Sequence, residues 1–123
     1  RDTSVTGVQT CALPIYVPKA ILNNKNDVLY FSRQTIPFLR GVPENEWLLR
    51  HRYYKHIGIY AYRADILAAI TRLEVSPLEK AEALEQLRWL ENGFSIRAVV
   101  TRYESHGVDT PDDLTTVTKK FLS

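Results

Sequence analysis

The stretch that decides the fold is His56 to Tyr62, which reads HIGIYAY and is the strongest strand candidate in the chain. Successive side chains of a strand point to opposite faces, so His56, Tyr60 and Tyr62 share one face. Both faces are largely uncharged, which is typical of a central strand that is covered on both sides. We therefore expect this strand to lie in the interior of a sheet.

A β-hairpin is predicted before this strand. Lys19 to Leu22 (KAIL) and Val28 to Ser32 (VLYFS) are short stretches of strand-forming residues, and the turn formers NNKND lie between them. A strand, a polar turn and a second strand make the pattern of a hairpin. Residues 34–46 contain two prolines and a glycine, which predicts a loop.

Helix and strand patterns alternate after the central strand. Ser76 and Glu79 form a capping box with Pro77 at the first helical position, which predicts a helix from Pro77 to about Glu91. The Asn-Gly pair that follows ends it. The other predicted elements are a helix over residues 64–73, a strand over 96–102 and a last helix that begins at Thr110-Pro111. This alternation predicts an α/β fold.

Length and charge restrict the class of protein. The chain has 123 residues, enough for one small domain with a hydrophobic core. The formal net charge is +2, which provides no strong field for nucleic acid. No apolar run is long enough to span a bilayer. We therefore expect neither nucleic acid nor a membrane as a partner.

Residues 1–15 differ from the rest of the chain. They show no sustained period of strand or helix, and an in-frame DNA that encodes Val5 to Ile15 matches the end of a widely used short-read sequencing adapter. We interpret residues 1–15 as a disordered, adapter-derived artefact and residues 16–123 as the C-terminal part of a single domain. Cys11 is the only cysteine, so the remainder has no thiol for a disulfide, a zinc site or a nucleophile.

Four blocks of residues 16–123 resemble the CMP-Kdo synthetases, a family of cytidylyltransferases, and they occur in the family's order. The spacing between the blocks also agrees, and the resemblance covers nearly all of this part of the chain. The blocks are Tyr30–Arg33 (YFSR) with Ile36-Pro37, His56–Arg63 (HIGIYAYR), Ser76–Glu79 (SPLE) leading to LEQLR, and Gly107–Leu114 (GVDTPDDL).

The resemblance implies an enzyme that transfers CMP from CTP to 3-deoxy-manno-octulosonate (Kdo) and releases pyrophosphate, for lipopolysaccharide biosynthesis. It implies a cytoplasmic, magnesium-dependent homodimer. The implied fold is of the nucleotide-diphospho-sugar transferase type, a three-layer α/β sandwich with a mixed sheet, of which residues 16–123 form the C-terminal, sugar-binding half.

Two blocks of that family are absent from the sequence. They are its basic triphosphate loop and its Gln-Gly-Asp-Glu-Pro block, which holds the other magnesium ligand. We therefore expect the chain alone to have no synthetase activity and to expose an apolar surface where the first half would pack.

Asp109 and Arg33 are the charged residues that the resemblance assigns to the site. Asp109 resembles the family's catalytic magnesium ligand, and a carboxylate oxygen suits that ion. The alternative is an acid that caps the last helix, but Thr110 already suits the cap. Arg33 resembles the arginine that binds the sugar carboxylate, to which a planar guanidinium is matched. Outside the motif it would be a solvent-exposed strand residue.

The other assigned residues are polar or aromatic. His56 and Tyr60 resemble residues that bind the sugar hydroxyls, although a lone strand histidine is more often part of a core. Glu85 and Gln86 resemble the family's polar pair on the long helix, for which the alternative is a solvated helix face. For Tyr62 the sequence leaves core packing and pocket lining equally open.

Other interpretations remain beside this one. The basic and aromatic run over residues 47–55 is interpreted as a subunit contact surface. The sugar acid of a related enzyme, such as a neuraminate, is an alternative substrate, although HIGIYAYR and LEQLR favour Kdo. A non-catalytic module is the alternative of a different class.

Overall fold

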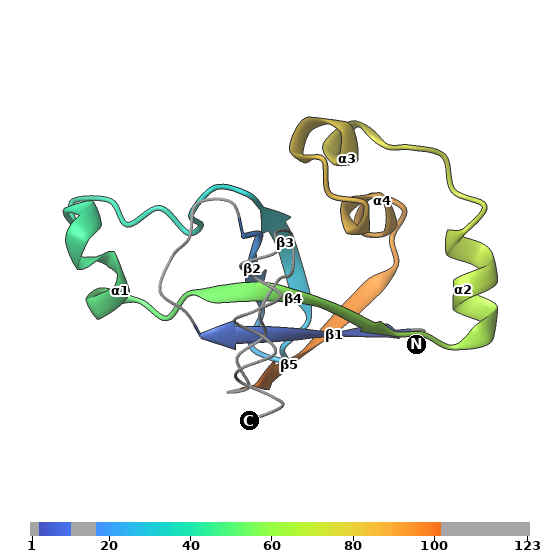
Figure 1. Cartoon of the computed structure of the whole chain (residues 1–123), viewed down its shortest axis with the longest axis horizontal. Helices are drawn as coiled ribbons and strands as arrows, with labels where there is room; N and C mark the ends of the chain where they lie inside the picture. The colour runs from blue at the N-terminus through green and yellow to red at the C-terminus, as the bar shows by residue number, and fades with distance from the viewer. Residues whose placement is uncertain (1–2, 11–16, 102–123) are drawn as a thin grey trace, which may run out of the picture.

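The structure, a computed structural model, describes residues 3–10 and 17–101 (Figure 1). These residues form a five-stranded mixed sheet in the order β3-β2-β4-β1-β5. The elements are β1 (Thr3–Thr10), β2 (Lys19–Leu22), β3 (Val28–Ser32), η1 (Glu44–Glu46), α1 (Trp47–Arg50), β4 (Tyr54–Ala61), α2 (Ala64–Ile70), α3 (Pro77–Glu82), α4 (Gln86–Glu91) and β5 (Ser95–Thr101). The predicted α/β class and the mixed sheet are confirmed.

The predicted hairpin is present as β2 and β3, which pair in antiparallel fashion. The side chain of Asn23 closes the turn because its Oδ1 accepts the backbone N–H of Lys25 at 2.8 Å and of Asp27 at 3.0 Å. Asn26 adopts the left-handed conformation at φ 64, which asparagine tolerates better than most residues. Local turn chemistry therefore sets the register of this hairpin.

The predicted central strand is β4, which pairs with β2 on one side and with β1 on the other. Its register with β1 shifts between Thr6 and Val8, and Gly58 has φ 85 in the same part of β4. A positive φ at this point favours glycine. The bulge keeps His56 and Tyr60 on one face, as the strand period predicts.

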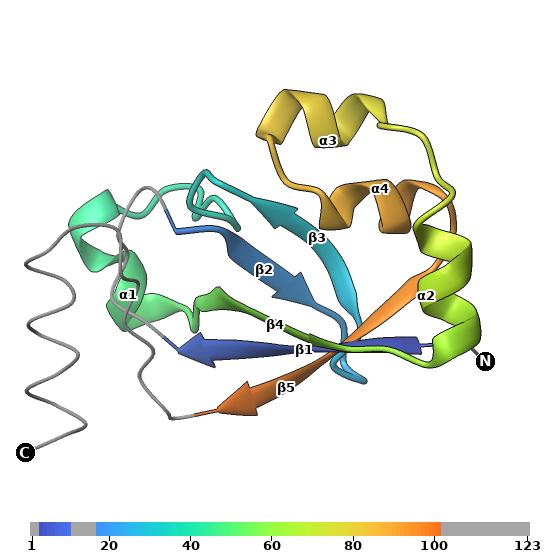
Figure 2. The same cartoon turned by 45° about the vertical axis from the view of Figure 1, so that its right-hand side comes forward.

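The expectation that both faces of this strand are covered is wrong for the described residues. Ile59 is 68% exposed, and Val99 of β5 is 55% exposed. In Figures 1 and 2, α3 and α4 lie over the sheet on the same side, with α2 at one end and α1 at the other. A strand sequence shows which side chains are apolar but not which element covers them, and the chain was also expected to expose an apolar surface where the first half would pack.

The expectation of disorder is wrong for Thr3–Thr10, which forms β1. This strand pairs antiparallel with β4 and parallel with β5, so hydrogen bonds flank it on both sides. Its sequence, TSVTGVQT, is rich in β-branched residues, which favour extended backbone even without strict alternation. The adapter origin of residues 1–15 stays a prediction.

The helix predicted over residues 77–91 is divided into α3 and α4. Ala83 adopts a left-handed conformation at φ 53 and ψ 47, which ends α3, and the chain turns before α4 begins. At the start of α3 the Glu79 carboxylate of the predicted capping box accepts the Ser76 N–H at 3.2 Å, whereas the Ser76 hydroxyl has no hydrogen-bond partner within the described residues. The cause of the break is tertiary and involves Arg33, as described below.

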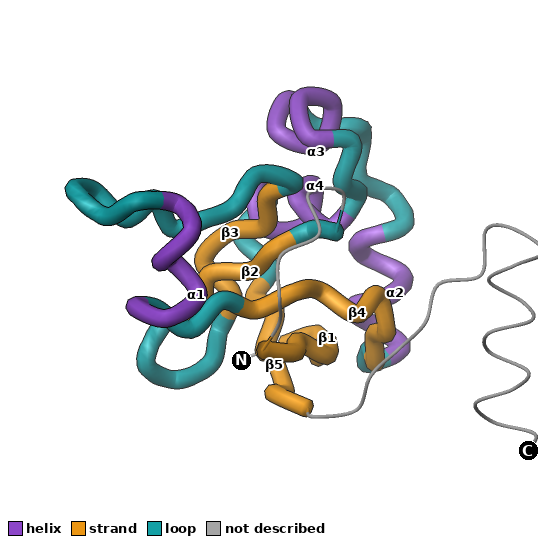
Figure 3. The backbone as a smooth tube through the Cα atoms, turned by 60° about the vertical axis from the view of Figure 1, so that its left-hand side comes forward, coloured by secondary structure: helices purple, strands orange, loops and turns teal. Residues whose placement is uncertain are grey.

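The hydrophobic core lies between the sheet and the helices. Figure 3 shows α4 between α3 and the strands, and α4 packs against β3 and β5. Phe31 and Leu87 are fully buried at its centre. The other core residues are Ala20, Val28, Ile66, Ile70, Leu84, Trp89, Ile96 and Ala98.

The break at Ala83 generates a prediction. Because a left-handed conformation is unfavourable for alanine but not for glycine, we expect Ala83→Gly to raise the free energy of unfolding by about 1 kcal/mol. The matched control is Ala68→Gly in the exposed interior of α2, which should lower it by about 1 kcal/mol. Urea unfolding of both variants is the measurement, and a continuous helix over 77–91 would instead make Ala83→Gly as destabilising as the control.

Candidate functional site

The face of β4 that carries His56 and Tyr60 is an aromatic cluster. The ring centroid of His56 lies 4.9 Å from Phe31 and 5.1 Å from Tyr60. Tyr60 stacks on Tyr62 at 5.8 Å, and the indole of Trp89 from α4 meets both tyrosines edge-on, at 5.1 and 5.7 Å. The structure therefore brings together two predicted sugar-site residues and fixes them with three further rings.

His56 is a neutral imidazole in this cluster, because burial lowers its pKa from 6.5 to about 4. Its Nε2 lies 2.9 Å from Thr6 Oγ1, and the same hydroxyl donates its only proton to the Ile59 carbonyl at 2.8 Å. The Thr6 oxygen therefore accepts a hydrogen bond from Nε2–H, which leaves Nδ1 as the acceptor nitrogen. A neutral imidazole of this kind suits an alcohol more than an anion.

The hydroxyl of Tyr60 is buried and makes no hydrogen bond of good geometry within the described residues, although the Thr6 side chain lies near it. Burial, followed by the proximity of Tyr62 and Glu85, raises the pKa of Tyr60 well above its usual range, so the phenol keeps its proton. A buried polar atom without a partner is costly and uncommon in folded proteins. A bound hydroxyl group would remove this cost.

Glu85 and Gln86 lie at the beginning of α4, one turn before Trp89. Gln86 is buried, with 7% of its surface exposed, whereas Glu85 is exposed. The pKa values of Tyr60 and Tyr62 are raised mainly by burial, and the negative charge of Glu85 raises them further. Glu85 and Gln86 therefore lie next to the aromatic cluster, and of the two only Gln86 is buried.

Arg33 contacts the turn between α3 and α4. Its Nε donates to the Glu82 carbonyl at 2.6 Å, and its Nη2 donates to the Ala83 carbonyl at 2.7 Å. The backbone N–H of Arg33 also donates to Glu82 Oε1 at 3.0 Å. Arg33 thus contacts the turn that precedes Glu85 and Gln86, and its guanidinium donates hydrogen bonds to backbone carbonyls.

Asp109, the predicted catalytic magnesium ligand, lies outside the described residues. Among residues 3–10 and 17–101, no three histidine, cysteine, aspartate or glutamate side chains are grouped so as to hold a metal ion. The described part of the chain therefore does not supply a complete metal site, and the magnesium assignment stays a prediction. The roles of the other predicted site residues also stay predictions.

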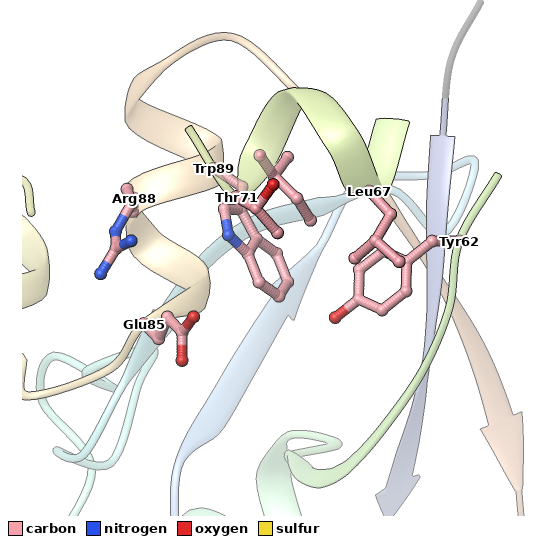
Figure 4. A pocket seen from close by; sticks show the side chains of 7 residues that line it. Tyr62, Leu67, Thr71, Glu85, Arg88 and Trp89 are labelled. Atoms are coloured by element: carbon pink, nitrogen blue, oxygen red, sulfur yellow. The ribbon is translucent and has the colours of Figure 1, made fainter. Parts of the chain in front are cut away.

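A pocket of about 240 Å³ adjoins the aromatic cluster (Figure 4). Tyr62 from the end of β4 and Glu85, Arg88 and Trp89 from the start and middle of α4 line it, and apolar side chains of α2 complete the wall. Figure 4 shows Glu85 and the Tyr62 hydroxyl directed into the same space, with the indole of Trp89 between them. Pocket lining is therefore the interpretation of Tyr62 that the geometry favours.

An ion pair at the wall of this pocket was not predicted from the sequence. Arg88 binds Glu79 with two hydrogen bonds, Nε to Oε1 at 2.7 Å and Nη2 to Oε2 at 2.6 Å. Its Nη1 donates to the Leu73 carbonyl at 3.2 Å. These hydrogen bonds, ahead of the other effects, hold the pKa of Glu79 below its usual value. A spacing of nine residues gives no local signal for such a pair, because only the turn at Ala83 brings the two helices together.

Comparison with known proteins identifies the family. A family model described as cytidylyltransferase matches residues 8–101, which include the end of β1 and every later described element. The chain belongs to the cytidylyltransferase family. A solved structure of a CMP:2-keto-3-deoxy-manno-octonic acid synthetase complexed with CTP superposes with a TM-score of 0.85 and 36% identity, over 97% of this chain and 48% of that one. The predicted fold type is thereby confirmed.

Two curated relatives of this cytidylyltransferase chain carry the same name. A 3-deoxy-manno-octulosonate cytidylyltransferase from Parabacteroides distasonis is 56% identical over 79% of this chain and 39% of the relative. One from Cytophaga hutchinsonii is 57% identical over 82% of this chain and 41% of the relative. The chain thus spans about two fifths of the length of these relatives. Within the described residues of the cytidylyltransferase chain, no helix is long and apolar enough to cross a membrane.

The buried histidine predicts a pH dependence of stability. Because the pKa of His56 is lower in the folded chain than the ordinary 6.5, the unfolded chain takes up the proton first, and stability falls as the pH drops from about 6.5 toward 4. We expect His56→Gln to remove about 1–2 kcal/mol of the stability loss between pH 7 and pH 5. Urea unfolding at both pH values measures it, and equal losses in the parent chain and the variant would contradict the assignment.

The contacts of Arg33 predict a structural effect that is independent of any ligand. Arg33→Lys removes the two-pronged contact with the carbonyls of Glu82 and Ala83, and we expect it to lower the free energy of unfolding by about 1 kcal/mol. Arg40→Lys, at an exposed loop position, is the matched control and should change it by less than about 0.5 kcal/mol. Equal midpoints for the two variants in thermal unfolding would show that the contact does not stabilise the chain.

Proposed function

We propose that this chain is the sugar-binding part of a CMP-Kdo synthetase, which transfers CMP from CTP to Kdo and releases pyrophosphate. The observation that carries the proposal is the pairing of a neutral His56 with the buried, unpartnered hydroxyl of Tyr60 on one strand. These groups offer an acceptor and a donor to a polyhydroxylated substrate. The names of the relatives and of the CTP-bound solved structure support the same activity.

Different residues of the site bind different groups of the sugar in this proposal. His56 and Tyr60 hold hydroxyl groups, and Glu85 and Gln86 approach from the start of α4. In the reaction, a sugar hydroxyl attacks the α-phosphorus of CTP, and pyrophosphate leaves. Orientation of the two substrates is a large part of catalysis for such a transfer. The magnesium ion, held in part by Asp109, would offset the charge of the phosphate oxygens.

Arg33 binds the sugar carboxylate in this proposal, and that role needs an account of its present contacts. Its Nε and Nη2 are engaged with the carbonyls of Glu82 and Ala83. A guanidinium carries five N–H donors, so Nη1 and the second proton of Nη2 remain for an anion. The two roles are therefore compatible, and the helix turn holds the guanidinium in place for the carboxylate.

A homodimer in the cytoplasm completes the proposal. Leu49 of α1 is 84% exposed and Phe38 of the preceding loop is 73% exposed, on the same part of the molecule as the predicted subunit contact. Phe38 packs edge-on against Trp47 at 5.3 Å, so this apolar surface rests on a fixed aromatic pair. Burial of such side chains is typical of a subunit interface.

The test is a chimera in which residues 16–123 replace the corresponding segment of the Parabacteroides distasonis relative. We expect the chimera to form CMP-Kdo and pyrophosphate, and the chain alone to form none. His56→Ala and Glu85→Ala in the chimera should lower kcat/KM by about 10- to 100-fold through lost hydroxyl contacts. Lys25→Ala, in the exposed hairpin turn, is the control and should leave it unchanged.

The same chimera separates the alternatives. A higher kcat/KM with N-acetylneuraminate than with Kdo would replace the proposed substrate by the acylneuraminate type. A folded chimera without activity on either acid would favour a non-catalytic role for this chain. The N-terminal segment of the relative, tested alone, shows how much activity it supplies by itself.

A further inference from the structure

Helix α3 differs from its neighbours α2 and α4 because none of its residues is buried. By contrast, α2 buries two of its seven residues and α4 buries three of its six. Leu78, the large apolar residue of α3, is 38% exposed. Figure 3 shows α4 between α3 and the strands, so α3 forms an outer layer. Hydrophobic burial therefore contributes little to the attachment of α3.

Polar contacts with α4 hold the first half of α3. The Glu79 carboxylate accepts hydrogen bonds from Nε and Nη2 of Arg88, at 2.7 and 2.6 Å. The backbone N–H of Leu78 donates to Oε2 of Glu91, also in α4, at 3.1 Å. Both acceptors are carboxylates, and hydrogen bonds to charged groups contribute more to stability than those between neutral groups. The attachment of this end of α3 therefore depends on charge.

Charged groups also hold the last turn of α3. The guanidinium of Arg33 donates to the carbonyls of Glu82 and Ala83, and the Arg33 backbone N–H donates to the Glu82 carboxylate. Burial raises the pKa of Glu82, but hydrogen bonds from the Arg33 backbone, Ser32 and Tyr30 outweigh burial and hold that pKa below its usual value. The carboxylate is therefore ionised near neutral pH. Both ends of α3 are thus attached through charged hydrogen bonds.

Two turning points of the chain lie on either side of α3. Glu74 and Val75 precede it outside any helix or strand, and Val75 is 52% exposed. Ala83 follows it in a left-handed conformation. Beyond these points the chain is anchored, because Leu73 packs against the core and Leu84 is buried within it. Residues 74–83 can therefore move away from α4 while α2 and α4 keep their places.

We propose that residues 74–83 form a flap that opens while the core stays folded, and that the hydrogen bonds of Glu79 and Arg33 keep it closed. Segments with few buried apolar contacts are the ones that open locally. Ser76 favours opening, because its buried hydroxyl has no hydrogen-bond partner in the part of the chain that the structure describes, and opening exposes it to water.

Opening of the flap changes the charge of the pocket between α2 and α4. Arg88 lines this pocket, and its ion pair with Glu79 crosses from α4 to the flap. When the flap is closed, the guanidinium is balanced by the carboxylate. When the flap opens, the carboxylate leaves and the pocket wall gains an unbalanced positive charge. The position of α3 therefore sets the charge at this wall, whichever reaction the protein catalyses.

The test is native-state hydrogen exchange of the full chain, followed by NMR at low urea concentrations. The reporters of the flap are the N–H groups of Lys80 and Leu84, which donate to carbonyls of residues 76 and 79. A detached helix of six residues does not persist in water, so their exchange reports opening. The references are the N–H groups of Phe94, which closes α4, and Ala98 of β5.

We expect Lys80 and Leu84 to exchange faster than the references and almost independently of urea, because opening of the flap exposes little surface. Phe94 and Ala98 should exchange with the steeper urea dependence of unfolding of the core. One common rate and urea dependence for all four groups would show that α3 opens only with the core, and would overturn the proposal. Exchange of Lys80 and Leu84 without any protection would also overturn it, because the flap would then not be closed.

A charge-removing variant tests what keeps the flap closed. Glu79→Gln keeps the shape of the side chain but removes its charge, and we expect it to lower the protection of both reporters about ten-fold and to leave the references unchanged. Glu46→Gln is the matched control, since it breaks the exposed pair with Arg50 in α1 and should change none of the four groups. Unchanged reporters in Glu79→Gln, or an equal loss of protection at the references, would contradict the proposal.

Discussion

The arrangement of the candidate site depends on the contact of the Arg33 guanidinium with the last carbonyls of α3. A helix end leaves carbonyl groups without partners, and Arg33 fills two of them at Glu82 and Ala83. This contact stabilises the left-handed Ala83, after which α4 starts in a new direction and packs against β3 and β5. Were the helix continuous, Glu85 and Trp89 would follow the axis of α3 and would leave the face of β4.

A second contact fixes the angle between the two helices. Glu79 in the first turn of α3 accepts two hydrogen bonds from Arg88 in α4, and both side chains are largely shielded from solvent, at 13% and 17% exposure. Glu79 is also the residue that completes the capping box with Ser76. One carboxylate thus links the start of α3 to the middle of α4, and it balances the charge of Arg88 at the wall of the pocket.

Local patterns predicted the hairpin and the capping box because their causes are local. Asn23 forms the turn with its own neighbours, and Glu79 reaches the Ser76 N–H within one helical turn. The break at Ala83 has no local cause, since alanine favours helix and the leucine spacing continues across it. The side-chain donors that meet its carbonyls belong to Arg33, which lies 49 and 50 residues away in sequence. The strand β1 was missed for a related reason, because its partners β4 and β5 are distant in the chain.

The candidate site, like the fold, was predictable only where its causes are local. The strand period places His56 and Tyr60 on one face, but only the resemblance to a family indicated that Glu85, Gln86 and Arg33 join them. The pocket needs three elements, β4, α2 and α4, and its single signal in the sequence was an aromatic residue, Trp89, one turn after Glu85. Asp109 lies outside the described residues, so its place in the site is still a prediction.

The charges of the described site bear on the proposed function. His56 is neutral, Tyr60 keeps its proton, and Arg88 is neutralised by Glu79. Such groups bind alcohols well but do little to offset the charge of a triphosphate, which needs several cations or a metal ion. The chain also spans about two fifths of its relatives' length. In the proposed function, these residues therefore serve the sugar, and the charge of the nucleotide is met by other groups.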